Sequence, residues 1–358
     1  MIKVNFNSDT TASVCPEILE KICAVAKEED YMLGYNQDKY SQEVRKIMQS
    51  YFSKPIECFF NVSGSGANIL SIKAMKDNYS SIICCGDTHI NRYEVGGTEY
   101  NTGCKIVACH SEDAKLTIDM IKKKLTSKNN FNYAYPKIVV LSEVTELGTC
   151  YTLQELKEIC EFCHKNDLYV YVDGARLANA MAFLNVGFKE ILEDTGVDIA
   201  SFGANKNGAM FGEMIIVLNP IFAKNFILNQ KQSMQLFSKT RFLSCQFLVM
   251  LKDNIWYKNA KHANDMALYF EQELKKVGVS LAYPVQSNAV FANFSNEQIE
   301  YLKKEYKLGA YDDEKSCCRL MTSWSTSNKE INDFIEYLKK FNVKWSLFNK
   351  VMKKVDNT

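Results

Sequence analysis

The sequence is poor in proline and histidine, with five and four residues respectively among 358. It contains no run of about 18 apolar residues, so no segment is predicted to cross a membrane as a helix. The formal net charge is +1 and no lysine and arginine stripe stands out, so the charge favours neither nucleic acid nor a membrane surface as partner. So few histidines leave few ligands for a metal site, and we expect none. We expect a small molecule as the partner.

Cysteine, in contrast, is abundant at thirteen residues, although the N-terminus does not resemble a secretory signal. The run Cys160-Glu-Phe-Cys163-His164 superficially matches a haem-attachment string. However, Leu156, Ile159 and the two cysteines recur at helical spacing, which places the thiols on the buried face of an amphipathic helix. We therefore predict structural thiols in a reducing compartment and a cytoplasmic protein.

Short runs rich in β-branched or aromatic residues recur in the first part of the chain and predict about seven strands. They are Cys58–Val62, Ser81–Cys85, Lys105–Cys109, Lys137–Glu143, Leu168–Asp173, Asp198–Gly203 and Glu213–Leu218. Helical patterns separate several of them, at Asn68–Lys76, Leu116–Leu125, Leu153–Lys165 and Phe188–Asp194. This alternation predicts an α/β protein with a large, mostly parallel sheet covered by helices on both faces. Ligands of such sheets bind at the carboxyl ends of the strands.

From about Leu248 onward the pattern changes to a long helix followed by a mixed segment. Strands are expected near Val279–Ala282, Ala289–Phe294 and Arg319–Thr322, and helices near Glu297–Lys307 and Lys329–Lys340. We therefore predict an N-terminal arm at residues 1–15, a large domain at 16–247 and a smaller α+β domain at 248–358. Few prolines and no low-complexity block predict that the two domains pack closely.

The segment LYVYVDGARLANA places the carboxylate of Asp173 at the end of a strand that is apolar on both faces. Arg176 follows three residues later. A buried carboxylate needs a partner, so the two residues could form a structural ion pair, or Asp173 could cap a turn. Taken alone, this pattern favours a structural role over a catalytic one.

Lys206 follows in SFGANKNGAMFG, where neither helix nor strand periodicity accounts for it. The surrounding glycines and asparagines predict a loop at the edge of the sheet. In a desolvated pocket there, the pKa of the lysine would fall and its amine could form a Schiff base. A solvated lysine in a surface loop is the alternative.

Two further segments would reach the same edge. In NVSGSGANILSIK a strand ends and Ser63, Gly64 and Ser65 lead into a helix. Backbone N–H groups and a hydroxyl converge there, which is typical of a phosphate site and also of an ordinary capped helix. His89 follows the next strand and could stack on an aromatic ring or move a proton. Each signal is weak alone, but together, at the carboxyl ends of strands in one sheet, they predict a functional site.

Several motifs resemble those of the low-specificity threonine aldolases, a group of β-eliminating lyases that use pyridoxal 5'-phosphate (PLP). The motifs are FNSDTT (6–11), SGSGAN (63–68), DTHI (87–90), TELGTCYTL (145–153), VDGAR (172–176), ANKNGAMFG (204–212) and RLMTSWST (319–326). The resemblance implies the fold type I of PLP-dependent transferases. It also implies a lyase that cleaves the Cα–Cβ bond of L-threonine, L-allo-threonine or a related β-hydroxy amino acid to glycine and an aldehyde.

The resemblance also implies roles at the cofactor. PLP would be attached covalently to Lys206, with Asp173 paired to the pyridine nitrogen and His89 stacked on the ring, and these three residues would be the catalytic ones. Gly64 and Ser65 would hold the phosphate. A carboxylate at the pyridine nitrogen keeps it protonated, which makes the ring an electron sink for negative charge left at Cα.

For the substrate, the resemblance implies that Arg176, which would also lie close to the cofactor, and Arg319 bind the α-carboxylate, with Ser8 as a further contact. A planar guanidinium suits a carboxylate. Fixing the carboxylate determines which bond of Cα stands perpendicular to the ring, and so selects Cα–Cβ cleavage over decarboxylation.

Because fold alone does not fix the reaction, the alternatives are a PLP-dependent β-eliminating lyase, an aminotransferase and a non-catalytic PLP-fold binding subunit.

Members of this group assemble as dimers or tetramers with active sites at subunit interfaces, so the resemblance implies a homodimer or homotetramer. Tyr35, Lys231 and Arg241 look like substrate-binding residues supplied by a neighbour, with solvated surface side chains as the alternative. Three residues depart from the family pattern. Asn205 stands where a serine or threonine usually precedes the lysine, and Asn7 stands where an arginine often precedes the serine–aspartate pair. Glu146 stands near a position where many members carry a second histidine. The base that would take the β-hydroxyl proton is therefore left open.

Overall fold

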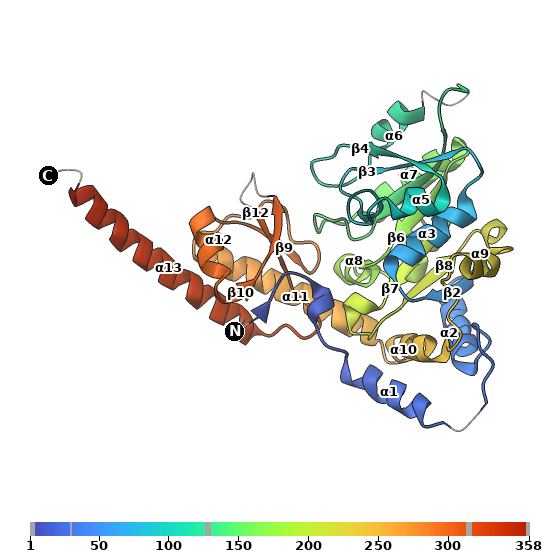
Figure 1. The fold of residues 1–358 in the computed structure, drawn as a ribbon, viewed down its shortest axis with the longest axis horizontal. Coiled ribbons are helices and arrows are strands. Elements are labelled where there is room, and N and C mark those ends of the chain that lie inside the picture. The colour runs from blue at the N-terminus through green and yellow to red at the C-terminus, as the bar shows by residue number, and fades with distance from the viewer. Residues whose placement is uncertain (1–3, 29–30, 126–129, 313–316, 356–358) are drawn as a thin grey trace.

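The computed structural model describes residues 4–28, 31–125, 130–312 and 317–355. Its larger part is built around a seven-stranded sheet of order β2-β8-β7-β6-β5-β3-β4 (Figure 1). The strands are β2 (Glu57–Asn61), β3 (Ser80–Cys85), β4 (Lys105–Cys109), β5 (Tyr135–Ser142), β6 (Tyr169–Asp173), β7 (Ile199–Gly203) and β8 (Glu213–Val217). Each predicted strand of the large domain overlaps one of these, so the predicted sheet is confirmed.

The direction of the strands decides which residues meet at one edge. Strands β4, β3, β5, β6 and β7 are parallel, whereas β8 pairs antiparallel with both β7 and β2. Because β2 is antiparallel to β8, it runs in the same direction as the five parallel strands. The carboxyl ends of these six strands and the amino end of β8 therefore share one edge of the sheet.

Both faces of this sheet are covered by helices. Alternate residues of β3 point to opposite faces, so Ile82 and Cys84 join one buried cluster and Ile83 and Cys85 join the other. The helices are α1 (Pro16–Ala26), α2 (Lys39–Ser50), α3 (Gly64–Met75), α4 (His89–Arg92), α5 (Gly97–Thr102), α6 (Ile118–Lys124), α7 (Leu153–Lys165), α8 (Leu177–Leu184), α9 (Phe226–Gln232), α10 (Arg241–Lys252) and α11 (Ile255–Lys276). Burial on both faces explains why the strands are continuous apolar runs. The segment predicted as a helix at Phe188–Asp194 is a π-helical turn at Lys189–Glu193.

A smaller unit follows, shown in orange and red in Figure 1. It contains β9 (Ala289–Asn293), α12 (Asn296–Leu302), β10 (Tyr306–Lys307), β11 (Gly309–Asp312), β12 (Cys317–Met321) and α13 (Asn328–Val355), with β11, β12 and β9 in one antiparallel sheet. The arm strand β1 (Val4–Asn5) pairs with β10. Phe6 is buried in this unit, with its ring centroid 5.1 Å from that of Phe270 and 5.7 Å from that of Phe334. This anchor fixes the arm, and with it the residues that follow Phe6.

Two predictions in the smaller unit are wrong in detail. The segment predicted as the strand Val279–Ala282 lies antiparallel to β9 and shares two backbone hydrogen bonds with it, but it forms an isolated β-bridge at Leu281 and not a strand. The helix predicted to reach Lys307 ends at Leu302, because the chain turns to pair Tyr306 with the arm strand β1. In both places, apolar residues that pack in the small core have a spacing like that of a regular strand or helix. The local sequence therefore cannot distinguish these segments from regular secondary structure.

Helix α11 belongs to both cores, since Trp256 and Ala260 pack in the large cluster and Phe270 and Leu274 in the small one. The predicted boundary at 247/248 falls inside α10, whose buried Leu251 also packs in the large cluster. The division into an arm (1–15), a large domain (16–247) and a small domain (248–358) stays a proposal, with α11 shared between the two domains.

The sequence features that suggested other functions have structural explanations. Cys160 and Cys163 carry free thiols and are buried on the inner face of α7, as predicted. The neighbouring His164 instead bonds Asp198, with 2.9 Å between Nε2 and Oδ2. Among the described residues, no helix has the length and apolar character that a membrane span requires, and no cluster of His, Cys, Asp and Glu could hold a metal ion.

Candidate active site

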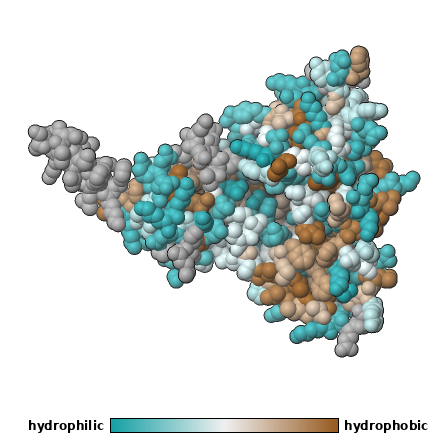
Figure 2. Space-filling view, viewed as in Figure 1, coloured by the Kyte–Doolittle hydropathy of each residue, from teal (hydrophilic) through white to brown (hydrophobic). Residues whose placement is uncertain are grey.

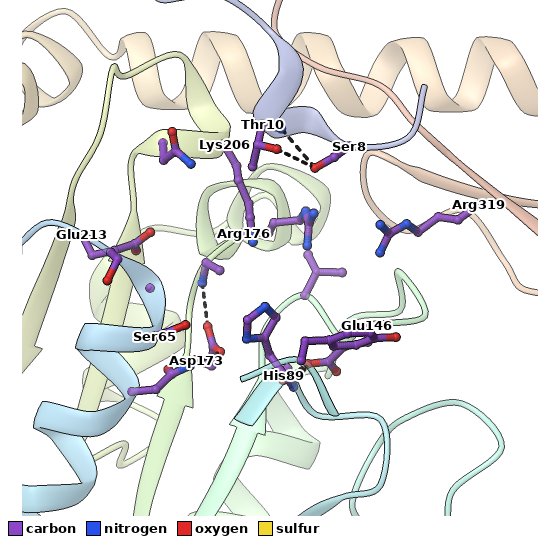
Figure 3. A pocket seen from close by; sticks show the side chains of 18 residues that line it. Ser8, Thr10, Ser65, His89, Glu146, Asp173, Arg176, Lys206, Glu213 and Arg319 are labelled. Atoms are coloured by element: carbon purple, nitrogen blue, oxygen red, sulfur yellow. Dashed lines mark hydrogen bonds between the residues drawn. The ribbon is translucent and has the colours of Figure 1, made fainter. Parts of the chain in front are cut away.

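A cavity of about 440 Å³ opens at the edge of the large sheet where the parallel strands end (Figure 3). Its lining comes from the loops after β2, β3, β5, β6 and β7, from the start of β8, from the arm and from β12. Eight of the predicted site residues line it: Ser8, Gly64, Ser65, His89, Asp173, Arg176, Lys206 and Arg319. The structure therefore brings together residues that are widely separated in the sequence.

Lys206 lies in a single 3-10 turn, Asn205–Asn207, directly after β7. The turn is anchored because Ala204 donates its backbone N–H to Gly212 and accepts one from Ala209. Figure 3 shows the lysine side chain reaching down into the cavity beside Arg176. Burial, together with the positive charge of Arg176, lowers the pKa of Lys206, although nearby carboxylates oppose the shift. A lowered pKa makes the amine available as a nucleophile.

Asp173 is the last residue of β6, and its side chain is held from two sides. Oδ2 accepts a hydrogen bond from Asn68 Nδ2 at 3.1 Å, and Oδ1 accepts one from the backbone N–H of Ala175 at 3.1 Å. Asp173 is 7% exposed. It makes no salt bridge to Arg176, so the structural interpretation of VDGAR as an Asp173–Arg176 pair is wrong. The carboxylate is fixed and faces the cavity.

Arg176 pairs instead with Asp9 of the arm. Its Nε and Nη2 donate to the two carboxylate oxygens of Asp9 at 2.6 and 2.9 Å, and Asn288 Nδ2 donates a third hydrogen bond at 3.0 Å. Burial alone would raise the pKa of Asp9, but the charge and hydrogen bonds of Arg176 outweigh it and lower the pKa to about 2. The Nη1 atom of Arg176 takes no part in this pair.

Replacing Asp9 with asparagine is expected to lower the free energy of unfolding by about 3 kcal/mol, because Arg176 would stay buried without its charge partner. The pKa of Asp9 is about 2 in the fold, below its ordinary value of 3.8, so its charge stabilises the protein at neutral pH. That contribution is lost as the pH falls from about 5 toward 2. Urea unfolding across this range should show the wild-type and Asp9→Asn stabilities converging in acid. A constant difference between them would contradict the assignment.

His89 begins α4 and is held by Glu94, a residue that the sequence did not single out. The His89 Nδ1 and Glu94 Oε1 atoms are 2.9 Å apart, and Glu94 also accepts hydrogen bonds from Asn68 Nδ2 and Thr98 Oγ1. Burial would raise the pKa of Glu94, but these hydrogen bonds lower it. Since Asn68 also bonds Asp173, one amide fixes both the strand-end carboxylate and the partner of the imidazole. Glu94 is therefore placed to orient His89.

One end of the cavity is formed by the N-terminus of α3. Ser63 caps this helix, with its Oγ accepting from the backbone N–H of Gly66 at 3.2 Å, so the helix begins earlier than the predicted Asn68. A Cβ on Gly66 would lie 2.4 Å from Oε1 of Gln235 and 2.9 Å from Nδ2 of Asn61, so a larger residue would force these side chains to move. The N–H groups of Gly64 and Ser65 face no intrahelical acceptor, as is general for a first helical turn, and can hold an anion.

Glu213, the first residue of β8, lies at the same end and was also missed. A Cβ on Gly64 would lie 3.7 Å from its Oε1 atom. Burial raises the pKa of Glu213, against the opposing charge of Lys206. A protonated Glu213 adds no negative charge beside an anion and can donate a hydrogen bond. The sequence feature that could have identified Glu213 is a glutamate as the first residue of an otherwise apolar strand, EMIIV.

Tyr35, Lys231 and Arg241 do not line this cavity. Lys231 Nζ lies 5.1 Å from the ring centroid of Tyr35, and the Arg241 guanidinium lies 5.1 Å from the ring of Phe242. The backbone N–H of Tyr35 donates to Ser238 at 3.0 Å, so the two segments lie side by side at the surface. Within one subunit these residues do not reach the site.

A buried amine of lowered pKa, a fixed strand-end carboxylate and an anion site suit the aldehyde, the pyridine nitrogen and the phosphate of PLP. The sheet that carries them is that of the fold type I enzymes. A solved aspartate aminotransferase from Thermus thermophilus shares the fold, with a TM-score of 0.69 at 12% identity over 95% of this chain and 91% of its own. The class of protein is thus a fold type I, PLP-dependent enzyme.

The chain belongs to the β-eliminating lyase family, whose model matches residues 5–297. The low specificity L-threonine aldolase of Pseudomonas aeruginosa is 33% identical, over 92% of this chain and 95% of that protein. A solved Leishmania major threonine aldolase superposes with a TM-score of 0.88 at 30% identity, covering 94% of this chain and 99% of its own. This chain is a PLP-dependent lyase.

Proposed function

We propose that the enzyme cleaves the Cα–Cβ bond of L-threonine, L-allo-threonine or a related β-hydroxy amino acid, releasing glycine and an aldehyde. The observation that carries this proposal is the meeting of Lys206, Asp173, Arg176 and Arg319 around one cavity. The similarity to enzymes named low specificity L-threonine aldolase supports the same reaction.

The residues that would hold PLP have separate tasks. When bound, PLP supplies an electron sink for the pair released at Cα. Lys206 would attach it, and Asp173 would keep the pyridine nitrogen protonated. The first turn of α3, with Ser65 and a protonated Glu213, would bind the phosphate. His89, oriented by Glu94, would pack against the ring.

Arginine side chains would orient the substrate. Arg319, on β12, donates through Nη2 to the backbone oxygen of Asn7 at 3.3 Å, which supports its position at the mouth of the cavity. Arg319 and Nη1 of Arg176 would bind the α-carboxylate, with Ser8 as a further contact. A fixed carboxylate leaves the Cα–Cβ bond as the one aligned for cleavage, and this alignment favours the aldolase over the decarboxylase reaction.

The enzyme would act in the cytoplasm as a homodimer or homotetramer in which Tyr35, Lys231 and Arg241 serve the cavity of a neighbouring subunit. Figure 2 shows hydrophobic residues gathered over α10 and α1. Large apolar side chains are exposed on this and adjoining surface segments, including Leu19, Leu33 and Met234. Such a patch supports association with another copy, because monomers rarely expose large apolar areas.

The test is to measure aldehyde release from L-threonine by the purified, PLP-loaded protein, together with its visible absorption before and after glycine is added. We expect aldehyde release and a spectral change with glycine, the product of cleavage. A coloured enzyme that releases ammonia and a keto acid but no aldehyde would instead identify a β-eliminating lyase. A transfer of the amino group to an added keto acid would identify an aminotransferase.

A further inference from the structure

Glu146 lines the cavity and has one carboxylate oxygen that none of the described residues engages. It lies in the loop between β5 and α7. Its Oε1 accepts hydrogen bonds from Ser142 Oγ and from the backbone N–H of His89, both at 2.8 Å. Its Oε2 is buried and has no hydrogen-bond partner within the described part of the chain. Leaving a buried carboxylate oxygen unpaired costs free energy, so this atom is a candidate for contact with a ligand.

The position of Glu146 separates it from the phosphate end of the site. In Figure 3, Glu146 lies by His89 on the side of Arg319, whereas Ser65 and Glu213 lie on the opposite side. Arg319 is one of the two arginines proposed to bind the substrate carboxylate. A substrate held there would present its Cβ substituents to the same region.

The other carboxylates of the site are already engaged or lie elsewhere. Asp173 is pinned by Asn68 and Ala175, and Asp9 is paired with Arg176. Glu94 is tied to His89, and that bond occupies the Nδ1 atom of the imidazole. Within the described residues, Glu146 thus combines access to the cavity with an oxygen that can accept a proton on the substrate side.

We propose that Glu146 is the base that takes the β-hydroxyl proton of the substrate during carbon–carbon cleavage. This proposal rests on the proposed aldolase function. The O–H bond breaks and its proton goes to Oε2 of Glu146, while the oxygen electron pair forms the C=O bond of the aldehyde. The electron pair of the broken Cα–Cβ bond stays on Cα, where a proton then takes the place of the departed carbon. Glycine is thus released, and the reaction needs neither an oxidant nor a reductant. The proton on Glu146 returns to solvent.

The charges around Glu146 suit a base at neutral pH. Burial, reinforced by the negative charge of Asp173, raises the pKa of Glu146 to about 7. Arg176, Cys84, Cys85 and Tyr151 are further titratable groups that interact with Glu146. His89, Lys206 and Arg319 line the same cavity. A base with a pKa near the working pH can both accept and release a proton within one cycle.

Two reactions can distinguish a base at the β-hydroxyl from other roles of Glu146. Aldehyde release from L-threonine needs a base at the β-hydroxyl, whereas exchange of a Cα proton of glycine with heavy water does not, because glycine has no hydroxyl. In Glu146→Gln, the amide oxygen can still accept from Ser142 and His89, so the local structure is preserved. We expect kcat for aldehyde release to fall by about 100-fold or more, with glycine exchange close to that of the wild type. The decline of wild-type kcat below about pH 7 should disappear in the variant.

Glu143 provides a matched control. It is also buried, burial raises its pKa to about 8, and its Oε1 has no partner in the described residues, but it does not line the cavity. Glu143→Gln should therefore leave the ratio of the two reactions unchanged. Glu146→Asp keeps a carboxylate and should retain part of the aldehyde release, which tests the idea if the glutamine variant is unstable.

The outcomes are distinct. A Glu146→Gln enzyme that cleaves L-threonine at the wild-type rate, or that loses aldehyde release and glycine exchange in parallel, overturns the role of Glu146 while the aldolase function stands. A wild-type enzyme that exchanges glycine but releases no aldehyde from any β-hydroxy amino acid overturns both proposals.

Discussion

Replacement of Lys206 by alanine is expected to remove the visible absorption band of the covalently held cofactor and to reduce aldehyde release by about 1,000-fold or more. The reason is that no other lysine lines the cavity in the described part of the chain. Burial and the charge of Arg176 lower the pKa of this amine, which suits it to bond with an aldehyde. Absorption spectra and initial rates of both proteins, each loaded with PLP, measure the two effects.

A matched control for this variant is Lys115→Ala. The Lys115 side chain is also mostly buried, at 15% exposed, but it pairs with Glu155 away from the cavity. It should keep both the absorption band and the activity. Borohydride reduction makes the bond between cofactor and lysine permanent, so peptide mapping should then find the label on the segment that contains Lys206. A label on another lysine would refute the assignment.

Replacement of Asp173 by asparagine is expected to reduce aldehyde release by about 1,000-fold, because a neutral amide cannot keep the pyridine nitrogen protonated. The amide can still accept from Ala175, but its NH₂ group would face the Asn68 amide nitrogen, which is itself a donor. Unlike the Glu146 variant, this one should lose glycine exchange along with aldehyde release, since both reactions need the electron sink. Rates of the two reactions in the same preparation provide the measurement.

Asp198→Asn is a suitable comparison, because Asp198 is another buried aspartate beside the sheet. It accepts hydrogen bonds from Val170, His164 and Asn219, and it does not line the cavity. Its replacement should lower the melting temperature while the folded enzyme keeps its kcat. If Asp173→Asn lost only stability and kept both reactions, a purely structural role for Asp173 would be established.

Much of the fold follows from local patterns. Apolar runs separated by amphipathic stretches identified all seven strands of the large sheet, because strands buried on both faces must be apolar throughout. The same patterns failed at Val279–Ala282 and beyond Leu302. There, partners distant in the sequence decided between strand, helix and loop.

The site was predictable to the extent that its residues sit at strand ends. Asp173 ends a strand of the parallel set, His89 and Lys206 follow two others, and the carboxyl ends of such strands meet at one edge. Glu213 escaped notice because β8 runs the other way, so it is the amino end of this strand that reaches the cavity. The antiparallel direction could not be read from the sequence EMIIV.

The sequence by itself determined the α/β class, the strands of the large sheet and the resemblance that implied PLP on Lys206, since these depend on residue type and spacing along the chain. Only the tertiary structure decided the interaction partners and the pKa values of the charged residues in the site. It paired Arg176 with Asp9 rather than Asp173, tied His89 to Glu94, and buried one oxygen of Glu146 without a partner among the described residues. The physical reason is that charge interactions and desolvation depend on distances through space. Those distances are set by the packing of the arm, the sheet edge and the smaller unit around one cavity.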